Sequence, residues 1–184
     1  KFHKEDVMGS GTACEETRLQ VGQKVSEFSA QALMADGSFK EVKLADYKGK
    51  WLVLFFYPLD FTFVCPTEIQ GFSKHYDEIK KLGADVLAAS TDSVYSHKAW
   101  SESSLGKINF PILGDTNHQV AKAFKVLIPA KGIALRGTFI IIPDGVLKSA
   151  TVIDMSAGLR VEETIRTLQC LQRVRPTGRC WTPG

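Results

Sequence analysis

The chain has 184 residues, of which 44% are hydrophobic and 23% are charged, a balance that is ordinary for one globular domain with a substantial core. Its formal net charge of +3 is too small to indicate nucleic acid or a membrane surface as a partner. No apolar run approaches the ~20 residues of a membrane span, and none has the layout of a signal peptide. We therefore expect a single-domain globular protein with no nucleic-acid partner and no membrane partner.

Four cysteines stand far apart in the chain, at Cys14, Cys65, Cys170 and Cys180. No two of them form a Cys-x-x-Cys pair, which argues against a thioredoxin-type dithiol motif and against a zinc knuckle. Few, widely spaced cysteines also do not resemble the disulfide framework of a small secreted protein. The pattern favours a reducing compartment and thiols that take part in chemistry.

The distribution of polar, glycine and proline residues divides the chain into three regions. Residues 1–18 are polar and contain Gly9-Ser10-Gly11, so we expect a flexible N-terminal arm in which Cys14 is exposed and not catalytic. Residues 19–172 carry the periodic apolar patterns of one folded domain. Residues 173–184 include two prolines and two glycines, which predicts an extended C-terminal tail.

The first half of the domain predicts a hairpin, a buried strand, a helix and a second strand. The residues after the turn signal Asp36-Gly37 alternate in polarity, which indicates a hairpin. Trp51–Phe56 is a short apolar run typical of a fully buried strand. One helix is then predicted by apolar residues at helical spacing, namely Ile69, Phe72, Tyr76 and Ile79. Gly83 would end that helix before a strand at Ala84–Ser90, and this order requires a right-handed crossover and a parallel portion of the sheet.

The second half of the domain predicts three more helices and three more strands. The capping residues Thr91-Asp92-Ser93 predict a short helix that extends through His97 and Trp100. We interpret His97 as a surface or capping residue rather than a general base. The other predicted elements are a strand at 110–113, a helix at 116–124, paired strands at 137–142 and 146–153, and a C-terminal helix marked by Val161, Ile165 and Leu168.

Cys65 lies between the buried strand Trp51–Phe56 and the helix that follows it. Pro66 would occupy the first turn of that helix, where a missing N–H removes no hydrogen bond. The thiol therefore meets the positive end of a helix dipole and unsatisfied N–H groups, which stabilise a thiolate and make the sulfur reactive. An inert buried cysteine is the alternative for a lone cysteine. The strand, loop and helix around Cys65 favour the reactive interpretation.

The residues around Cys65 match a known motif. Pro58, Thr62 and Cys65 form Pro-x-x-x-Thr-x-x-Cys, and the fuller match is Phe61-Thr62-Phe63-Val64-Cys65-Pro66-Thr67-Glu68. On these residues the chain resembles the peroxiredoxins, and among them the typical two-cysteine branch, from about Leu19 to Gly184. The resemblance implies a thioredoxin-like α/β fold in which helices flank a central mixed β-sheet. It also implies a thiol peroxidase that reduces hydrogen peroxide and small alkyl hydroperoxides without a metal or an organic cofactor.

Peroxide chemistry gives candidate roles to two residues before Cys65. Attack of a thiolate on a peroxide needs hydrogen-bond donors at the O–O bond and shielding from water. Thr62 precedes Cys65 by three residues, so in a helical first turn its hydroxyl would lie on the same side, as a peroxide ligand or as a simple N-terminal cap. Pro58 has no N–H to donate and is expected to shape and shield the pocket.

The resemblance adds a cation and a carboxylate to the candidate site. Arg136 opens Arg136-Gly137-Thr138-Phe139-Ile140-Ile141, the context in which the family has its active-site arginine, so a fixed positive charge beside Cys65 is implied. Glu68 is similar to the family glutamate that orients this arginine. From the residues alone, Arg136 would be a surface residue and Glu68 a first-turn glutamate favoured by the helix dipole. A second family arginine corresponds to Arg160 only with a one-residue shift.

Cys180 is the candidate resolving cysteine, which would condense with a sulfenic acid formed on Cys65. Its segment, Thr177-Gly178-Arg179-Cys180-Trp181-Thr182-Pro183-Gly184, resembles the family's tail, although the usual residues between the cysteine and the tryptophan are absent. The resemblance implies a disulfide between Cys65 of one chain and Cys180 of its partner. Cys170 is the competitor, and we expect it to be a structural thiol that lies roughly opposite the apolar stripe of the C-terminal helix.

The two-cysteine resemblance also implies partners. The chain is expected to form a homodimer, and five dimers a decamer, with a second interface around the Cys65 loop, Thr91-Asp92-Ser93 and Trp100. Thioredoxin or another disulfide reductase would donate electrons. We expect a cytoplasmic protein, and organellar targeting stays open because the chain starts at Lys1 without a methionine. The alternative function is a ring-forming holdase chaperone or a peroxide-signalling relay that uses the same cysteine switch.

Overall fold

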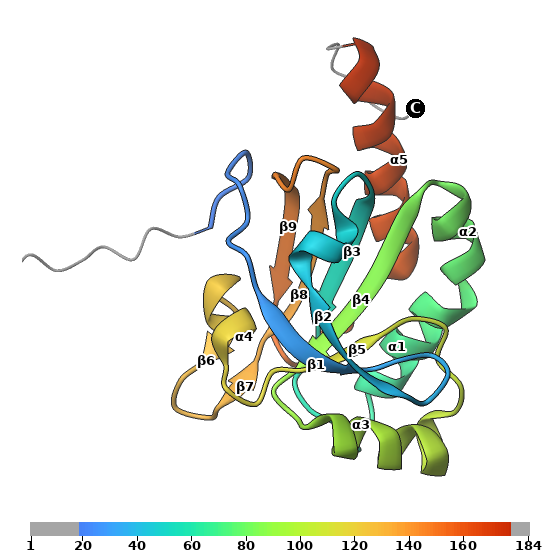
Figure 1. Ribbon diagram of the computed structural model, residues 1–184, viewed down its shortest axis with the longest axis vertical. Coiled ribbons are helices and arrows are strands. Elements are labelled where there is room, and N and C mark those ends of the chain that lie inside the picture. Colours follow the sequence, from blue (N-terminus) through green and yellow to red (C-terminus); the bar gives the residue numbers. More distant parts are fainter. Residues whose placement is uncertain (1–18, 178–184) are drawn as a thin grey trace, which may run out of the picture.

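The computed structural model describes residues 19–177, so Cys14 and Cys180 lie outside the described residues. A seven-stranded sheet forms its centre, in the order β2-β1-β5-β4-β3-β8-β9 (Figure 1). The strands are β1 (Ser29–Leu33), β2 (Phe39–Lys43), β3 (Trp51–Phe56), β4 (Ala84–Ser90), β5 (Ile112–Gly114), β8 (Arg136–Ile141) and β9 (Leu147–Ile153). A separate small hairpin that the sequence did not predict consists of β6 (Leu127–Ile128) and β7 (Ile133–Ala134).

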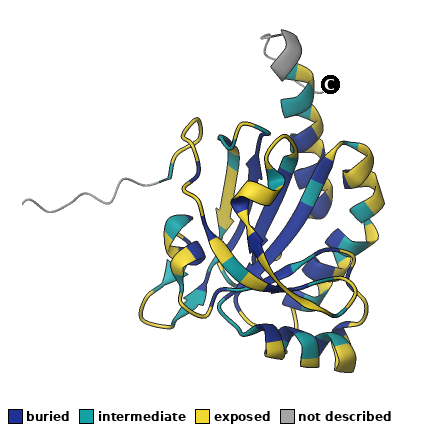
Figure 2. Ribbon diagram, in the orientation of Figure 1, coloured by how far each residue is buried: buried dark blue, intermediate teal, exposed yellow. Residues whose placement is uncertain are grey.

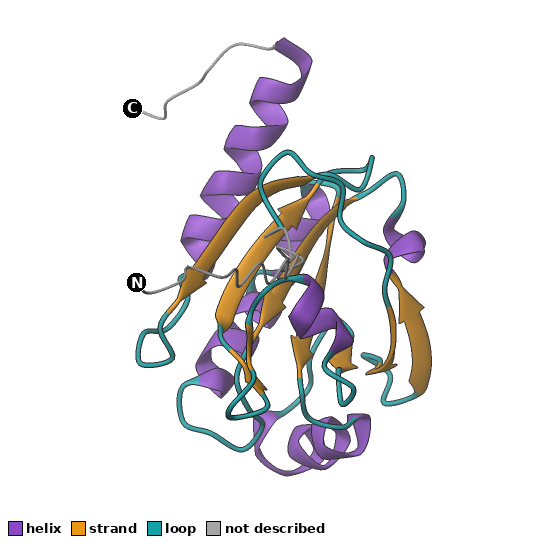
Figure 3. Ribbon diagram, turned by 90° about the vertical axis from the view of Figure 1, so that its left-hand side faces the viewer, coloured by secondary structure: helices purple, strands orange, loops and turns teal. Residues whose placement is uncertain are grey.

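Helices cover both faces of the sheet. They are α1 (Cys65–Lys74), α2 (Tyr76–Lys81), α3 (Val94–Trp100), α4 (Gln119–Ala123) and α5 (Val161–Thr177), with a 3-10 turn at Leu44–Tyr47 and a π-helical turn at Ser101–Leu105. One face carries α1, α2 and α5, and the other carries α4 (Figure 1 and Figure 3). The helix α3 lies at the end of the sheet where β3 and β4 finish.

The sheet is mixed, as the order of the predicted elements required. β3 pairs parallel with β4, and β4 pairs parallel with β5, which confirms the predicted parallel portion of the sheet. β8 lies antiparallel on the other side of β3, with Phe56 opposite Gly137. This register places the start of β8 beside the end of β3, where the loop toward Cys65 begins.

The apolar run in β3 is buried on both faces (Figure 2). Leu52, Leu54 and Phe56 pack in the cluster that includes α4, whereas Val53 and Phe55 pack in the cluster that includes α1, α2 and α5. Phe55 stacks on Phe72 of α1 with 4.2 Å between the ring centroids. The core therefore fixes α1, and with it Cys65, directly against the central strand.

The predicted helix after Cys65 is divided in two at His75. The side chain of Asn109 donates to the carbonyl of Ser73 at 3.2 Å, and the Asn109 N–H donates to the Ser73 hydroxyl at 3.2 Å. His75 then has φ −93° and ψ 7°, outside the α-helical region, and α2 begins at Tyr76. A contact from a distant loop thus interrupts a pattern that is continuous in the sequence.

Two further helices differ in length from the prediction. α4 starts only at Gln119, because His118 has a left-handed φ of 60° and the Asp115 carboxylate accepts the N–H groups of the next turn. α5 continues to Thr177, into the segment predicted as an extended tail. The side chain of Gln172 donates to the carbonyl of Leu82 at 2.5 Å and ties this part of α5 to the end of α2.

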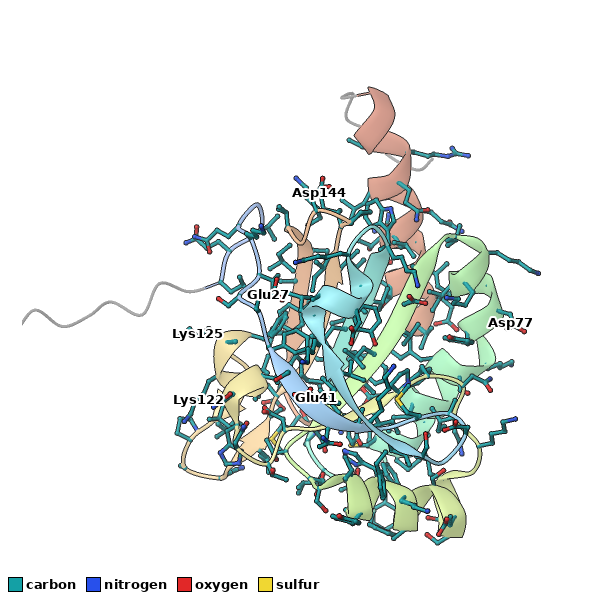
Figure 4. The ribbon with its side chains drawn as sticks, in the orientation of Figure 1. Glu27, Glu41, Asp77, Lys122, Lys125 and Asp144 are labelled. Atoms are coloured by element: carbon teal, nitrogen blue, oxygen red, sulfur yellow. The ribbon has the colours of Figure 1, made fainter. Side chains whose placement is uncertain are left out.

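Charged side chains are spread over the molecule rather than gathered on one face. Figure 4 labels examples from different elements, among them Lys122 of α4, Glu41 of β2 and Asp144 of the turn between β8 and β9. These three residues are exposed. This spread agrees with the small net charge of +3.

The cap of α3 can be tested directly. Ser93 accepts the N–H of Ser96 at 3.2 Å, as the capping pattern predicted. Ser93→Ala should lower the free energy of unfolding by about 1 kcal/mol, because an N–H of the first turn loses its acceptor. Ser93→Asp keeps an acceptor and should stay close to the wild type in chemical denaturation. Equal unfolding midpoints for Ser93→Ala and the wild type would show that this cap adds nothing.

Candidate active site

Cys65 is the first residue of α1 and is fully buried, with 0% of its surface exposed. Pro66 occupies the first turn, as predicted, and the N-cap residue, Val64, has a side chain that cannot accept a hydrogen bond. The start of α1 therefore has no side-chain cap, and its N–H dipoles act on the sulfur without competition from a carboxylate or hydroxyl at the cap. The sulfur therefore lies at the positive end of the α1 dipole.

Arg136 joins Cys65 to a carboxylate. Its Nη1 atom donates to Sγ of Cys65 at 3.5 Å and to the carboxylate of Glu68. Its Nε atom donates to the carbonyl of Met155 at 3.1 Å. Arg136 is 4% exposed and Glu68 is 3% exposed, so the guanidinium acts where water screens little of its charge.

The strand β8 explains why Arg136 reaches the thiol. Side chains alternate along a strand, so Arg136 and Ile140 point to the face that carries α1, where Ile140 packs in the core. Gly137 follows Arg136 at a point where the opposite face of β8 is crowded. A Cβ atom there would lie 2.9 Å from the ring of Phe139 and 3.1 Å from Val126. The glycine of the Arg-Gly pair thus lets β8 pack closely at the level of the site.

Glu68 is held from two sides. The N–H of Leu159 donates to its Oε1 atom at 2.7 Å, and Arg136 binds its other oxygen. Burial raises the pKa of Glu68 above its ordinary value, while the Leu159 N–H and the Arg136 charge oppose that rise. The carboxylate therefore orients Arg136 and partly neutralises its charge.

Thr62 and Pro58 lie in the loop between β3 and α1. Pro58 is buried and Thr62 is half-buried. The Thr62 hydroxyl donates to the carbonyl of Leu59 at 3.1 Å, and α1 begins only at Cys65, so Thr62 stands before the helix rather than in its first turn. The structure thus brings Cys65, Glu68 and Arg136 into contact, while Thr62 bonds within its own loop.

Other groups at the site could not be assigned from residue types. Met155 and Leu159 contribute a backbone carbonyl and a backbone N–H, which leave no mark on the sequence. Arg160, the shifted candidate for a second arginine, is exposed beside Leu159. His97, interpreted as a surface or capping residue, is fully buried, so that interpretation is wrong.

Cys170 lies within α5 and is half-buried. Nη1 of Arg166, one turn earlier, donates to its Sγ atom at 3.6 Å. This thiol is neither fully packed, as a structural thiol would be, nor in contact with Cys65 among the described residues. Cys170 is therefore a half-buried thiol beside the positively charged side chain of Arg166.

Residues 19–177 contain no group of three or more His, Cys, Asp or Glu side chains that could hold a metal ion. Within the same residues no helix has the length and apolar character to cross a bilayer.

A family model described as the AhpC/TSA family matches residues 21–150, which include Cys65, Glu68 and Arg136. The chain belongs to the AhpC/TSA family. It is 51% identical over 158 residues to a putative peroxiredoxin in the rubredoxin operon of Clostridium pasteurianum, across 83% of this chain and 89% of that protein.

Solved structures agree with the family. The crystal structure of Enterococcus faecalis AhpC matches with a TM-score of 0.86 and 41% identity, over 91% of this chain and 100% of that chain. The reduced 2-Cys peroxiredoxin of Plasmodium vivax matches with a TM-score of 0.86 and 32% identity, over 89% of this chain and 88% of that chain. The chain is thus a peroxidase of the peroxiredoxin family, and the predicted thioredoxin-like α/β fold is confirmed.

The raised pKa of Glu68 predicts how stability changes with pH. The native state binds the Glu68 proton more tightly than the unfolded chain does. The stabilisation that this proton gives is therefore complete below pH 4.5, the ordinary pKa of the group, and is lost as the pH rises through the higher pKa of the native state. Glu68→Gln removes the titration. The free energy of unfolding of the wild type minus that of Glu68→Gln should therefore decrease as the pH rises through this window, in denaturation curves measured at several pH values.

Glu163 is the matched control. It is an exposed carboxylate whose pKa is lowered by hydrogen bonds from Arg166, so its stabilisation is present above the ordinary value of 4.5 and is lost on acidification. The difference between the wild type and Glu163→Gln should change with pH in the opposite direction. If both differences change in the same direction, the attraction of Arg136 outweighs the burial of Glu68.

Proposed function

We propose that the protein reduces hydrogen peroxide and small alkyl hydroperoxides through Cys65. The contact between Arg136 and the Cys65 sulfur, at 3.5 Å in a buried site, is the observation that supports this most directly. The Cys65 thiolate attacks the nearer peroxide oxygen, the O–O bond breaks, and the other oxygen leaves with its electron pair and takes up a proton. The products are a Cys65 sulfenic acid and water or an alcohol.

The surrounding residues have separate roles in this proposal. Arg136 holds Cys65 as a thiolate and stabilises the charge that grows on the leaving oxygen. Glu68 orients Arg136. Thr62 donates to the bound peroxide in place of the Leu59 carbonyl, and Pro58 shields the site from water.

The length of α5 supports resolution by a second copy of the chain. Leu159, two residues before α5, contacts Glu68 and so marks the active-site end of this helix. The helix has 17 residues and is therefore about 26 Å long. The far end of α5, three residues before Cys180 in the sequence, therefore lies about one helix length from the end that is next to Glu68. Cys180 of a partner chain is not limited in this way, and a disulfide between Cys65 and that residue is what we propose.

Two surfaces support the assembly that this disulfide needs. β9 is an edge strand of seven residues, and such an edge can pair with the same edge of a second copy to make a homodimer. Exposed apolar side chains stand in the Cys65 loop and on α3, with Phe63 98% exposed and Tyr95 73% exposed. We propose this second surface as the contact that joins five dimers into a decamer.

Thioredoxin or another disulfide reductase then regenerates the dithiol, and the expected location is the cytoplasm.

The exposed apolar residues around Phe63 also favour a second candidate function. A holdase chaperone, or a relay of peroxide signals, would use such a surface to bind other proteins. Peroxide consumption at catalytic enzyme concentration supports the peroxidase. Protection of an unfolding client by Cys65→Ser, which has no peroxidase chemistry, would support the holdase.

The role of Arg136 predicts a large kinetic effect. In Arg136→Gln the rate constant of Cys65 with hydrogen peroxide should fall by about 100-fold, because a charged donor beside the reacting atoms is lost. Stopped-flow measurement on pre-reduced protein gives this rate constant. Arg166→Gln removes an exposed guanidinium from α5 and should leave the rate unchanged. Equal rates for the two variants would remove Arg136 from the mechanism.

A non-reducing gel tests the pair of cysteines. Pre-reduced protein that receives one equivalent of hydrogen peroxide should form a covalent dimer in the wild type and in Cys170→Ser, and none in Cys65→Ser or Cys180→Ser. A dimer that survives Cys180→Ser but is lost in Cys170→Ser would move the resolving role to α5. Peroxide consumption without any disulfide would mean a one-cysteine enzyme.

A further inference from the structure

A buried polar cluster lies beside the active-site loop and has no part in the chemistry described so far. The hydroxyl of Tyr57 donates to Oδ1 of Asp60 at 2.8 Å, and Nδ1 of His97 lies 2.8 Å from Oδ2 of the same carboxylate. Nε2 of His97 lies 3.0 Å from the carbonyl of Leu113 in β5. Tyr57 and His97 are fully buried and Asp60 nearly so, which is an uncommon place for an aspartate and a histidine.

Hydrogen bonding in this cluster is complete. Both nitrogens of His97 face oxygen atoms, Nδ1 that of the Asp60 carboxylate and Nε2 that of the Leu113 carbonyl. Burial and the nearby Asp60 raise the pKa of Tyr57 well above its ordinary value, so its hydroxyl keeps its proton and donates. The backbone N–H of Asp60 also donates, to Oδ2 of Asp92 at 2.9 Å. The carboxylate and the backbone of Asp60 are thus both fixed.

The cluster holds one end of the loop that carries the reactive cysteine. Asp60 comes five residues before Cys65, and the loop contains no regular structure between β3 and α1. Phe61, the next residue, has a left-handed φ of 55°, which is strained for an aromatic residue and persists only where the surroundings impose it. On its other side the ring of Phe61 packs on Trp100 of α3 at 5.9 Å between centroids. The same helix, α3, thus holds Asp60 through His97 and Phe61 through Trp100.

We infer that Tyr57, Asp60 and His97 form a positioning cluster that keeps the Cys65 loop in its strained conformation and so sets the sulfur against Arg136. None of the three is a catalytic residue, because the hydrogen bonds of their side chains run to one another and to the Leu113 carbonyl rather than to Cys65 or Arg136. The inference rests on the proposed reaction of Cys65 with peroxide. It adds residues that act on that reaction only through the loop.

Variants of Asp60 separate positioning by hydrogen bonds from a simple requirement for charge. Asp60→Ala removes every side-chain bond and should lower the rate constant of Cys65 with hydrogen peroxide by about tenfold or more, because small displacements of reacting groups slow a reaction strongly. Asp60→Asn can accept from Tyr57 and donate to a neutral His97, so it should recover most of that rate constant. Tyr57→Phe, a milder change that keeps the packed ring, should give an intermediate loss.

The measurements use the full chain with Cys14, Cys170 and Cys180 replaced by serine, so that Cys65 is the one thiol. Stopped-flow consumption of peroxide gives the rate constant, thiolate absorbance reports the ionisation of Cys65, and denaturation gives the stability. Asp115→Ala is the control, because Asp115 is also a buried carboxylate but its side chain accepts from the N–H groups of Val120 and Ala121 in α4 rather than from the loop. It should lose stability and keep the rate constant.

The outcomes separate the inference from the proposed function. If the parent protein reacts no faster than free cysteine, the proposed function fails. A second outcome is that the parent reacts fast and that Asp60→Ala and Tyr57→Phe keep its rate constant, as the control Asp115→Ala is expected to do. The cluster then only stabilises the fold, and the inference is overturned. Failure of Asp60→Asn to recover any rate lost in Asp60→Ala would overturn it as well. Should Asp60→Ala not fold, the comparison of Tyr57→Phe with Asp115→Ala decides the question.

Discussion

A buried guanidinium is the constraint around which the site is built. Arg136 has to lie next to the Cys65 sulfur, and a charge removed from water is costly unless it is paired, so Glu68 and the Met155 carbonyl accompany it. Removing one partner of such a buried pair typically costs about 3–5 kcal/mol. The strand order of the sheet meets this requirement, because β8 pairs with β3 and brings Arg136 to the end of β3. The first turn of α1 brings Cys65 and Glu68 together.

Two groups of polar residues act on the reactive sulfur, one by direct contact and one through the loop before it. Arg136 and Glu68 act from the side of β8 and the loop before α5, and they set the charge around Cys65. Asp60 and His97 act from the side of α3 and hold the loop before Cys65. The first group concerns the electrostatics of the reaction and the second its geometry. Both stand at the carboxyl ends of β3 and β4, the usual place for a site in an α/β sheet.

Much of this arrangement is predictable from the sequence, because strands and helix starts leave local patterns. The burial of β3, the place of Cys65 before a helix and the hairpin at Asp36-Gly37 all follow from periodicity and turn residues. The arginine and the glutamate followed only from the resemblance, since neither residue has a local pattern that points to the other. The interruption at His75 and the burial of His97 depend on contacts with distant residues, Asn109 and Asp60, which periodicity cannot reveal.

The most direct measurement is to trap the first product of the reaction on Cys65. In Cys170→Ser/Cys180→Ser, pre-reduced protein would receive one equivalent of hydrogen peroxide together with a reagent that labels sulfenic acids, and peptide mass spectrometry would locate the label. The account predicts rapid, nearly complete labelling of Cys65 and almost none of Cys14. Labelling spread over both thiols, or a Cys65 that stays reduced while peroxide persists, would contradict the claim that the buried Arg136 makes this one sulfur reactive.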